Sequence, residues 1–202
     1  MTTLLIIIIV LLIVVGFGVL GIYNRLVTLK NRVKNAWSQI DVQLQRRYDL
    51  IPNLVETVKG YMEFEKGTLE AVIKARSQAM TAREHIQNEG GTPTEGSIKQ
   101  LVGAEQALSS GLGRIFALAE NYPQLRSTEN MQQLQEELKS TENKVAFSRQ
   151  SYNDQVMLYN TAQEQFPASI FAGMFGHKLA DLYQVEDVEA KKAIKVSFTS
   201  QG

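Results

Sequence analysis

Residues 29–62 read LKNRVKNAWSQIDVQLQRRYDLIPNLVETVKGYM, and the spacing of the apolar side chains in this stretch decides the fold. These side chains recur every three or four residues. They are Leu29, Val33, Trp37, Ile40, Leu44, Tyr48, Ile51, Val55, Val58 and Met62. The mean step of about 3.7 residues is the period of a nearly straight helix with one buried stripe. We therefore predict one long amphipathic helix, followed by a turn between Gly60 and Gly67.

Pro52 lies inside this pattern and raises the question of whether the helix ends there. A proline in a helix interior removes the N–H group that would bond the carbonyl of Tyr48. In one interpretation Asp49 caps a helix that restarts, with Pro52 in its first turn. Because the apolar phase passes through Pro52 unbroken, we favour a continuous, kinked helix. Water, or an arginine or asparagine side chain from another helix, would then bond the Tyr48 carbonyl.

An uncharged apolar run precedes the amphipathic helix. Residues 4–22 read LLIIIIVLLIVVGFGVLGI. At the rise of an α-helix these residues extend about 28 Å, close to the thickness of a bilayer core. Only Met1, Thr2 and Thr3 precede the run, so the basic segment of a signal peptide is missing. We predict an uncleaved single-pass membrane anchor over residues 1–24 that continues directly into the amphipathic helix.

The charges that flank the anchor predict its orientation. Arg25, Lys30, Arg32 and Lys34 follow the span with no acidic residue before Asp41, and the N-terminal flank has neither lysine nor arginine. Cytoplasmic flanks of membrane helices carry an excess of such cations. We therefore expect the soluble domain in the cytoplasm.

A second helix is predicted over residues 68–87. The face turned toward the core carries Leu69, Val72, Ile73, Arg76 and Met80. A loop follows over residues 88–96, NEGGTPTEG, because glycine, proline and small polar residues cluster there without periodicity.

A third helix begins at Ser97, a good N-cap, and ends at Pro123. Its apolar stripe consists of Leu101, Ala104, Leu108, Leu112, Ile115, Ala119 and Tyr122. This helix is also rich in small residues. They are Gly103, Ser109, Ser110, Gly111 and Gly113. Because small residues lower helix propensity, we expect them to serve the close approach of another backbone.

A fourth helix begins at Ser127 or Thr128 and ends at Pro167. Its core positions recur every seven residues. They are Met131, Leu138, Val145, Tyr152, Tyr159 and Phe166. Four antiparallel helices with short connections form a bundle, so the predicted fold class is all-α. The bundle covers residues 25–176, and residues 177–202 form a C-terminal tail.

The sequence lacks the known motifs of catalytic and cofactor sites. A GxGxxG pattern at residues 16–21 lies in the apolar run with no strand before it, so it does not predict a dinucleotide site. His85 and His177 are isolated, and the chain has no cysteine. Its 21 basic and 21 acidic residues balance, which argues against a nucleic-acid surface. We predict no catalytic residue, cofactor, metal ion or small-molecule substrate.

Polar residues inside the helical stripes are the candidate functional residues. They are Arg46, Arg47, Asp49 and Asn53 in the first helix and Arg149, Tyr152, Asn153, Tyr159 and Asn160 in the fourth. The two Tyr–Asn pairs are seven residues apart and face one direction. In one interpretation their hydroxyl and amide groups are satisfied in the core and set the helix register. In the other they form an interface for oligomerisation or for a partner helix.

Four stretches of the chain resemble the LemA family of bacterial membrane proteins. They are NAWSQIDVQLQRRYDLIPNLVETVKGY at residues 35–61, TLEAVIKAR at 68–76, LRSTENMQQLQEELKSTENKVAFSRQSYNDQVMLYN at 125–160 and FPASIFAGMFG at 166–176. Besides polar residues already named, these motifs contain Trp37, Pro52, Phe166, Pro167, Phe171 and Phe175. The loop at residues 88–96 is longer than in the family pattern.

The resemblance implies a single N-terminal helix in the bacterial inner membrane that carries a bundle of long antiparallel helices. It implies no enzymatic activity, because none is established for the family. One branch resembles magnetosome membrane proteins that are needed to form vesicles, and other members are encoded near membrane metalloproteases. Both associations favour a membrane-organising or adaptor role. Some members carry a lipoprotein leader instead, for which this chain lacks the cysteine.

Three functional hypotheses follow. The first is a non-enzymatic membrane scaffold that self-associates through its bundle, with the lipid bilayer and further copies as partners. The second is an adaptor or regulator of another membrane protein, such as a quality-control metalloprotease, with residues 166–176 as the exposed surface for that partner. The third is an enzyme, supported only by the arginine, aspartate and tyrosine residues around Asp49. The missing catalytic motifs favour the first hypothesis.

Overall fold

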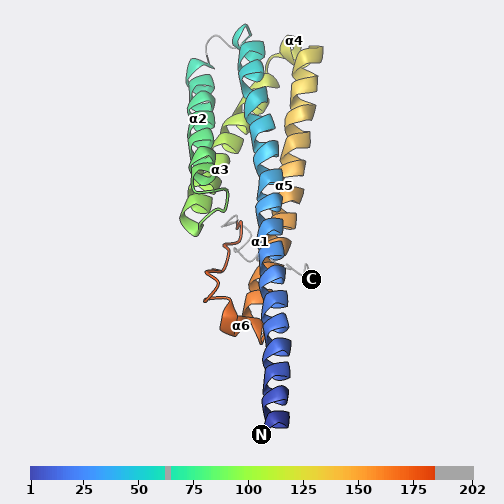
Figure 1. Cartoon of the computed structure of the whole chain (residues 1–202). Helices are drawn as coiled ribbons and strands as arrows, with labels where there is room; N and C mark the ends of the chain where they lie inside the picture. The colour runs from blue at the N-terminus through green and yellow to red at the C-terminus, as the bar shows by residue number, and fades with distance from the viewer. Residues whose placement is uncertain (62–64, 185–202) are drawn as a thin grey trace, which may run out of the picture.

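The computed structural model describes residues 1–61 and 65–184, which contain six helices (Figure 1). The four long ones are α1 (Thr2–Lys59), α2 (Lys66–Asn88), α3 (Glu95–Ala119) and α5 (Glu129–Glu164). The helices α4 (Pro123–Arg126) and α6 (Ala168–Phe171) have four residues each. The direction of the chain reverses from each long helix to the next. The predicted all-α fold, an apolar N-terminal helix followed by an antiparallel bundle, is therefore confirmed.

Helix α1 joins the apolar run and the amphipathic stripe in one helix of 58 residues. Its side chains are exposed over residues 2–18, whereas Leu26, Val33 and Ile40 are buried in the bundle. Figure 1 shows that the N-terminal part of α1 projects beyond the other helices. In the described part of the chain, α1 is the one helix long and apolar enough to cross a bilayer.

Pro52 lies within α1 and does not end it. The prediction of a continuous helix is confirmed, and the alternative restart at Asp49 does not occur. The carbonyl of Tyr48, which Pro52 cannot bond, accepts a hydrogen bond of 2.7 Å from Nε of Arg76 on α2. Of the predicted donors, which were water, an arginine and an asparagine, an arginine of another helix replaces the missing N–H.

Arg83 forms a second polar link between α2 and α1. Its guanidinium bonds both carboxylate oxygens of Asp41, at 2.5 and 3.0 Å, and the side-chain oxygen of Gln45 at 2.6 Å. Arg76 and Arg83 are seven residues apart, so both lie on the side of α2 that faces α1. Charged hydrogen bonds therefore set the position of α2 on α1.

Apolar packing holds the helices in two pairs, α1 with α5 and α2 with α3. The buried residues of α2 are Leu69, Val72, Ala75, Ala79, Ala82 and Ile86. The prediction for this face was wrong at Ile73, which is 50% exposed, while Arg76 and Met80 are partly buried. Three of these six buried residues are alanines.

The expected close approach to α3 occurs at Gly111. A Cβ atom on this residue would lie 2.8 Å from Cγ2 of Val72 on α2. Gly103 and Gly113 have open space around them, so the small residues of α3 share no common role.

Two helix ends differ from the prediction. The N-cap of α3 is Thr94 and not Ser97, which instead completes a capping box. The side chain of each residue accepts a hydrogen bond from the backbone N–H of the other. The N-cap of α5 is Thr128, one of the two predicted caps, but the helix ends at Glu164. Phe166 therefore lies outside the helix and is 82% exposed, because the residue before Pro167 disfavours the helical conformation.

The other five heptad positions of α5 are buried, from Met131 to Tyr159. The core runs along the full length of this seam and continues into α1, α2 and α3. Met62 and residues 185–202 of the expected tail lie outside the described residues.

We predict that Arg76→Met lowers the free energy of unfolding by about 2 kcal/mol, because it removes a charged donor from a partly buried carbonyl. The same change should cost less than about 1 kcal/mol in a Pro52→Ala background, where the restored N–H bonds the Tyr48 carbonyl. Denaturant unfolding of the detergent-solubilised chain, followed by helical circular dichroism, measures both values. Equal losses in the two backgrounds would contradict this role for Arg76.

Candidate functional site

A cluster of polar side chains is buried between α1 and α3. Tyr48 donates its hydroxyl proton to Oε1 of Glu105 at 2.5 Å, and Arg47 donates from Nη1 to Oε2 at 3.2 Å. The second Nη of Arg47 donates to Oγ of Ser109 at 2.8 Å. Arg47, Tyr48 and Glu105 are each more than nine-tenths buried. Both oxygens of the carboxylate thus have donors from a single segment of α1.

Burial controls the protonation of this cluster. Loss of water raises the pKa of Glu105 above its usual range, although Arg47 and the Tyr48 hydroxyl act in the opposite direction. Burial and the nearby Glu105 carboxylate raise the pKa of Tyr48, so its hydroxyl stays protonated and acts as the donor. A carboxylate bonded on both oxygens inside the protein is held in place. These contacts position α3 against α1.

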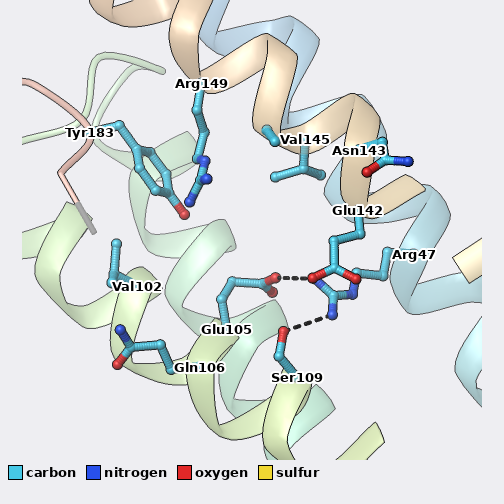
Figure 2. A pocket seen from close by; sticks show the side chains of 11 residues that line it. Arg47, Val102, Glu105, Gln106, Ser109, Glu142, Asn143, Val145, Arg149 and Tyr183 are labelled. Carbon is cyan, nitrogen blue, oxygen red and sulfur yellow. Dashed lines mark hydrogen bonds and ion pairs between the residues drawn. The ribbon is translucent and has the colours of Figure 1, made fainter. Parts of the chain in front are cut away.

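A cleft of about 460 Å³ opens beside the cluster, between α1, α3, α5 and Tyr183 (Figure 2). Figure 2 shows Arg149 of α5 next to the ring of Tyr183, with 5.5 Å between the guanidinium carbon and the ring centroid. This contact is a cation–π interaction. The cleft lining contains no histidine, and the described residues contain no group of acids and histidines suited to a metal ion.

Residues 177–184, which we call the C-terminal strap, run along α5 without forming a helix. Asn160 bonds both backbone groups of Ala180, accepting from its N–H and donating to its carbonyl at 2.9 Å each. Asn153 bonds the N–H of Tyr183 at 2.8 Å and its carbonyl at 3.1 Å. Each asparagine therefore pairs with the strap's main chain as a neighbouring β-strand would.

The spacing of these contacts explains the repeat in α5. Seven residues of helix advance by about 10.5 Å, and three residues of extended chain advance by about 10 Å. Asn153 and Asn160 therefore match Tyr183 and Ala180, with the strap extended and antiparallel to α5. The seven-residue spacing of the Tyr–Asn pairs in α5 thus matches the three-residue spacing of the backbone groups that they bond in the extended strap.

The tyrosines of the two pairs hold the strap from the buried side. The Tyr152 hydroxyl donates to the carbonyl of Asp181, and the Tyr159 hydroxyl bonds Nδ1 of His177, each at 2.8 Å. Burial, with a smaller effect of Lys30, lowers the pKa of His177. Burial also raises the pKa of Tyr159, so its hydroxyl stays protonated and can donate to the neutral ring where Nδ1 carries no hydrogen.

Trp37 completes this contact through an aromatic cluster. Its ring meets Tyr152 edge-on with centroids 5.7 Å apart and stacks on Tyr183 at 6.3 Å. Trp37 and Tyr183 are both buried, so the strap contributes to the bundle core. The polar groups of α5 bond within the chain, as the first interpretation of the Tyr–Asn pairs expected. Their partner, however, is the strap and not another helix.

The structure separates the predicted site residues into two groups. Around the cleft and the strap it assembles Trp37, Arg47, Arg149, Tyr152, Asn153, Tyr159 and Asn160. On the surface of α1 it leaves Arg46, Asp49, Pro52 and Asn53 exposed. Near α6, Phe166 and Pro167 are exposed and Phe171 and Phe175 are half-buried.

Asp49, around which the enzyme hypothesis was built, does not belong to the buried cluster. Its carboxylate accepts a hydrogen bond of 2.7 Å from Gln45 on the exposed side of α1. The buried acid is Glu105, which sequence reasoning missed together with Ser109, Tyr183 and the role of His177. A signal for Glu105 existed, because it follows Leu101 by four residues and precedes Leu108 by three. A carboxylate in that phase faces the core.

The sequence is similar to a known protein family and to several individual proteins. A sequence model of the LemA family matches residues 36–198. Magnetosome protein MamQ 2 of Paramagnetospirillum magneticum is 27% identical over 175 residues, which cover 80% of this chain and 64% of the relative. MamQ of Magnetospirillum gryphiswaldense is 26% identical over 174 residues with the same coverage. Protein LemA of Metamycoplasma hominis is 24% identical over 180 residues, covering 89% and 74%. The chain thus spans less than two thirds of the MamQ relatives.

We predict strong coupling between Arg47 and Glu105. Arg47→Met and Glu105→Leu should each lower the free energy of unfolding by about 3–5 kcal/mol, because each leaves a buried charge without its partner. The double variant should lose at least about 2 kcal/mol less than the sum of the two. Lys59→Met with Glu56→Leu, an exposed pair, is the matched control and should show coupling near zero. Additive losses at Arg47 and Glu105 would refute the structural role of the pair.

We predict that the strap loosens in acid. The pKa of His177 is lower in the folded chain than the unfolded value of about 6.5. Below that value the unfolded segment binds more protons, so docking is strongest above about pH 6.5 and weakens as the pH falls. Protection factors for the amides of Ala180 and Tyr183 should therefore drop between pH 7.5 and 5.5.

The matched variant for this experiment is His177→Asn, whose side-chain oxygen can accept from Tyr159 but does not titrate. Its strap should keep the same protection at both pH values. A similar loss of protection in the variant would show that another group is responsible.

Proposed function

The chain belongs to the LemA family, and on this premise we propose that it is a membrane-anchored scaffold that acts without catalysis and self-associates through its bundle. Helix α1 supports anchoring, because one helix carries the apolar run into the core. The names of the MamQ relatives refer to an assembly, the magnetosome, and to no reaction. The cations after the span favour a cytoplasmic bundle, which stays a prediction.

The observation that carries self-association is the exposure of Phe147 on α5. This side chain is 74% exposed and stands beside a groove between α1 and α5 of about 640 Å³. Most of the side chains that line the groove are polar, among them Arg32, Gln39 and Ser151. Leu158, eleven residues beyond Phe147 and on the same side of α5, is 52% exposed. We call this side of the bundle the Phe147 face.

The membrane restricts how two copies can meet. Two bundles anchored in one bilayer are related by a two-fold axis along the membrane normal, so residues at equal height face one another. Phe147 and the groove beside it lie at one height because they form one site. Each Phe147 can then enter the groove of the other copy, and the contact is self-complementary.

The second candidate function is an adaptor for another membrane protein. It is favoured by the exposed apolar side chains of residues 166–175, which include Phe166, Ile170 and Met174. These side chains lie at the opposite end of α5 from its N-terminus and are separate from the groove at Phe147.

We predict that Phe147→Asp weakens self-association at least about tenfold, because it removes the aromatic ring that enters the groove of the other copy. Light scattering of the detergent-solubilised chain over a concentration series measures the change. Met157→Asp is the matched control: Met157 is 59% exposed on α5 but does not line the groove, so association should persist.

The chain has no cysteine, so Ser151→Cys introduces a single thiol for crosslinking in membranes. A parallel two-fold contact brings the two thiols to the same height, and oxidation should give a disulfide-linked dimer that Phe147→Asp abolishes. A strictly monomeric wild-type chain at all concentrations, with no crosslink, would exclude self-association through this face.

A further inference from the structure

In residues 166–175, which we call the foot, the large apolar side chains are exposed and a small one is buried. Phe166 is 82%, Ile170 57% and Met174 78% exposed. The buried side of the foot is formed by the small Ala172, which packs in an apolar cluster with Leu26 of α1. Large apolar groups thus point outward where a soluble bundle would carry polar ones.

The foot packs against α1 at the C-terminal end of the apolar run. Phe175 packs edge-on against Tyr23, with ring centroids 5.2 Å apart, and Phe171 stacks on Phe175 at 6.3 Å. Tyr23 is the residue that follows the apolar stretch of residues 4–22. Ile22, the last residue of that stretch, packs against the cluster of Leu26 and Ala172. Figure 1 shows α6 below the four-helix part of the bundle, beside the projecting segment of α1.

Residue types change in a definite order away from this end of the span. The apolar run comes first, and the rings of Tyr23, Phe171 and Phe175 come next. The exposed cations Arg25 and Lys30 follow on α1, and the exposed Lys178 follows the foot. Aromatic rings at the headgroup level and cations just beyond it are typical of a membrane–water interface.

We propose that the foot is a second membrane contact, with its exposed apolar side chains inserted at the boundary between headgroups and acyl chains of the leaflet that α1 leaves. The ligand is the lipid surface itself. The Tyr23–Phe175 contact joins the foot to the end of the apolar run, so a bilayer surface at the level of Tyr23 meets the foot. This contact does not depend on self-association through the Phe147 face.

A second contact changes what the anchor can do. A single span is free to tilt and to rotate about its axis unless neighbouring groups restrain it. The foot lies on one side of α1, so its insertion restrains the tilt of α1 and its rotation about its own axis. The Phe147 face is then held at a constant height above the bilayer and at a constant inclination to it.

Site-specific labelling of the full-length chain in liposomes tests the proposal. Single-cysteine variants Phe166→Cys and Met174→Cys carry an environment-sensitive fluorophore, and Ile73→Cys on α2, itself 50% exposed, is the matched control. All three positions are exposed, so labelling does not disturb the core. Quenchers attached near the headgroup end of lipid acyl chains should quench the foot labels at least about threefold more strongly than the control label.

Three results would overturn the proposal. Equal quenching of foot and control labels by an aqueous quencher would show that the foot is in water. Protection of the foot that disappears when the protein is diluted into excess lipid would identify a second copy as its partner. Protection that arises only when another membrane protein is reconstituted would favour the adaptor function instead.

Discussion

Tyr48 connects three helices through two atoms. Its carbonyl, which lacks a helical donor because of Pro52, accepts from Arg76 of α2, and its hydroxyl donates to Glu105 of α3. Since α1 continues without a break into the apolar run, this junction fixes α2 and α3 relative to the anchor. The proline therefore creates the acceptor through which α2 is positioned, and it does so without ending the helix.

Helix α5 positions the strap through hydrogen bonds, as Tyr48 of α1 positions α2 and α3. Two asparagines bond backbone groups of residues 180 and 183, so this part of the contact depends on the spacing of the helix. Tyr183 then reaches Trp37 of α1 and Arg149 of α5. The segment expected to begin a tail thus closes the bundle core and one wall of the cleft.

The polar groups of the interior are used for structure, and the exposed surfaces proposed for partners carry large apolar side chains. The buried acid, arginine and tyrosines bond one another or the strap. On the outside, the Phe147 face is suited to a second copy and the foot to lipid. The two lie at different heights along α5, so one bundle can make both contacts at once.

The sequence by itself determined the helices, the apolar anchor, the continuity through Pro52 and the family, because each depends on local periodicity or on contiguous motifs. It also predicted that water, or an arginine or asparagine side chain of another helix, would bond the Tyr48 carbonyl, since the missing N–H is a local fact. Only the tertiary structure decided which arginine does so, that Glu105 and not Asp49 is the buried acid, and that Asn153 and Asn160 bind the strap. These partners lie 57 residues apart for Tyr48 and Glu105, and 30 for Asn153 and Tyr183. Periodicity shows which side of a helix is buried, but the docking of helices in space selects the atoms that meet there.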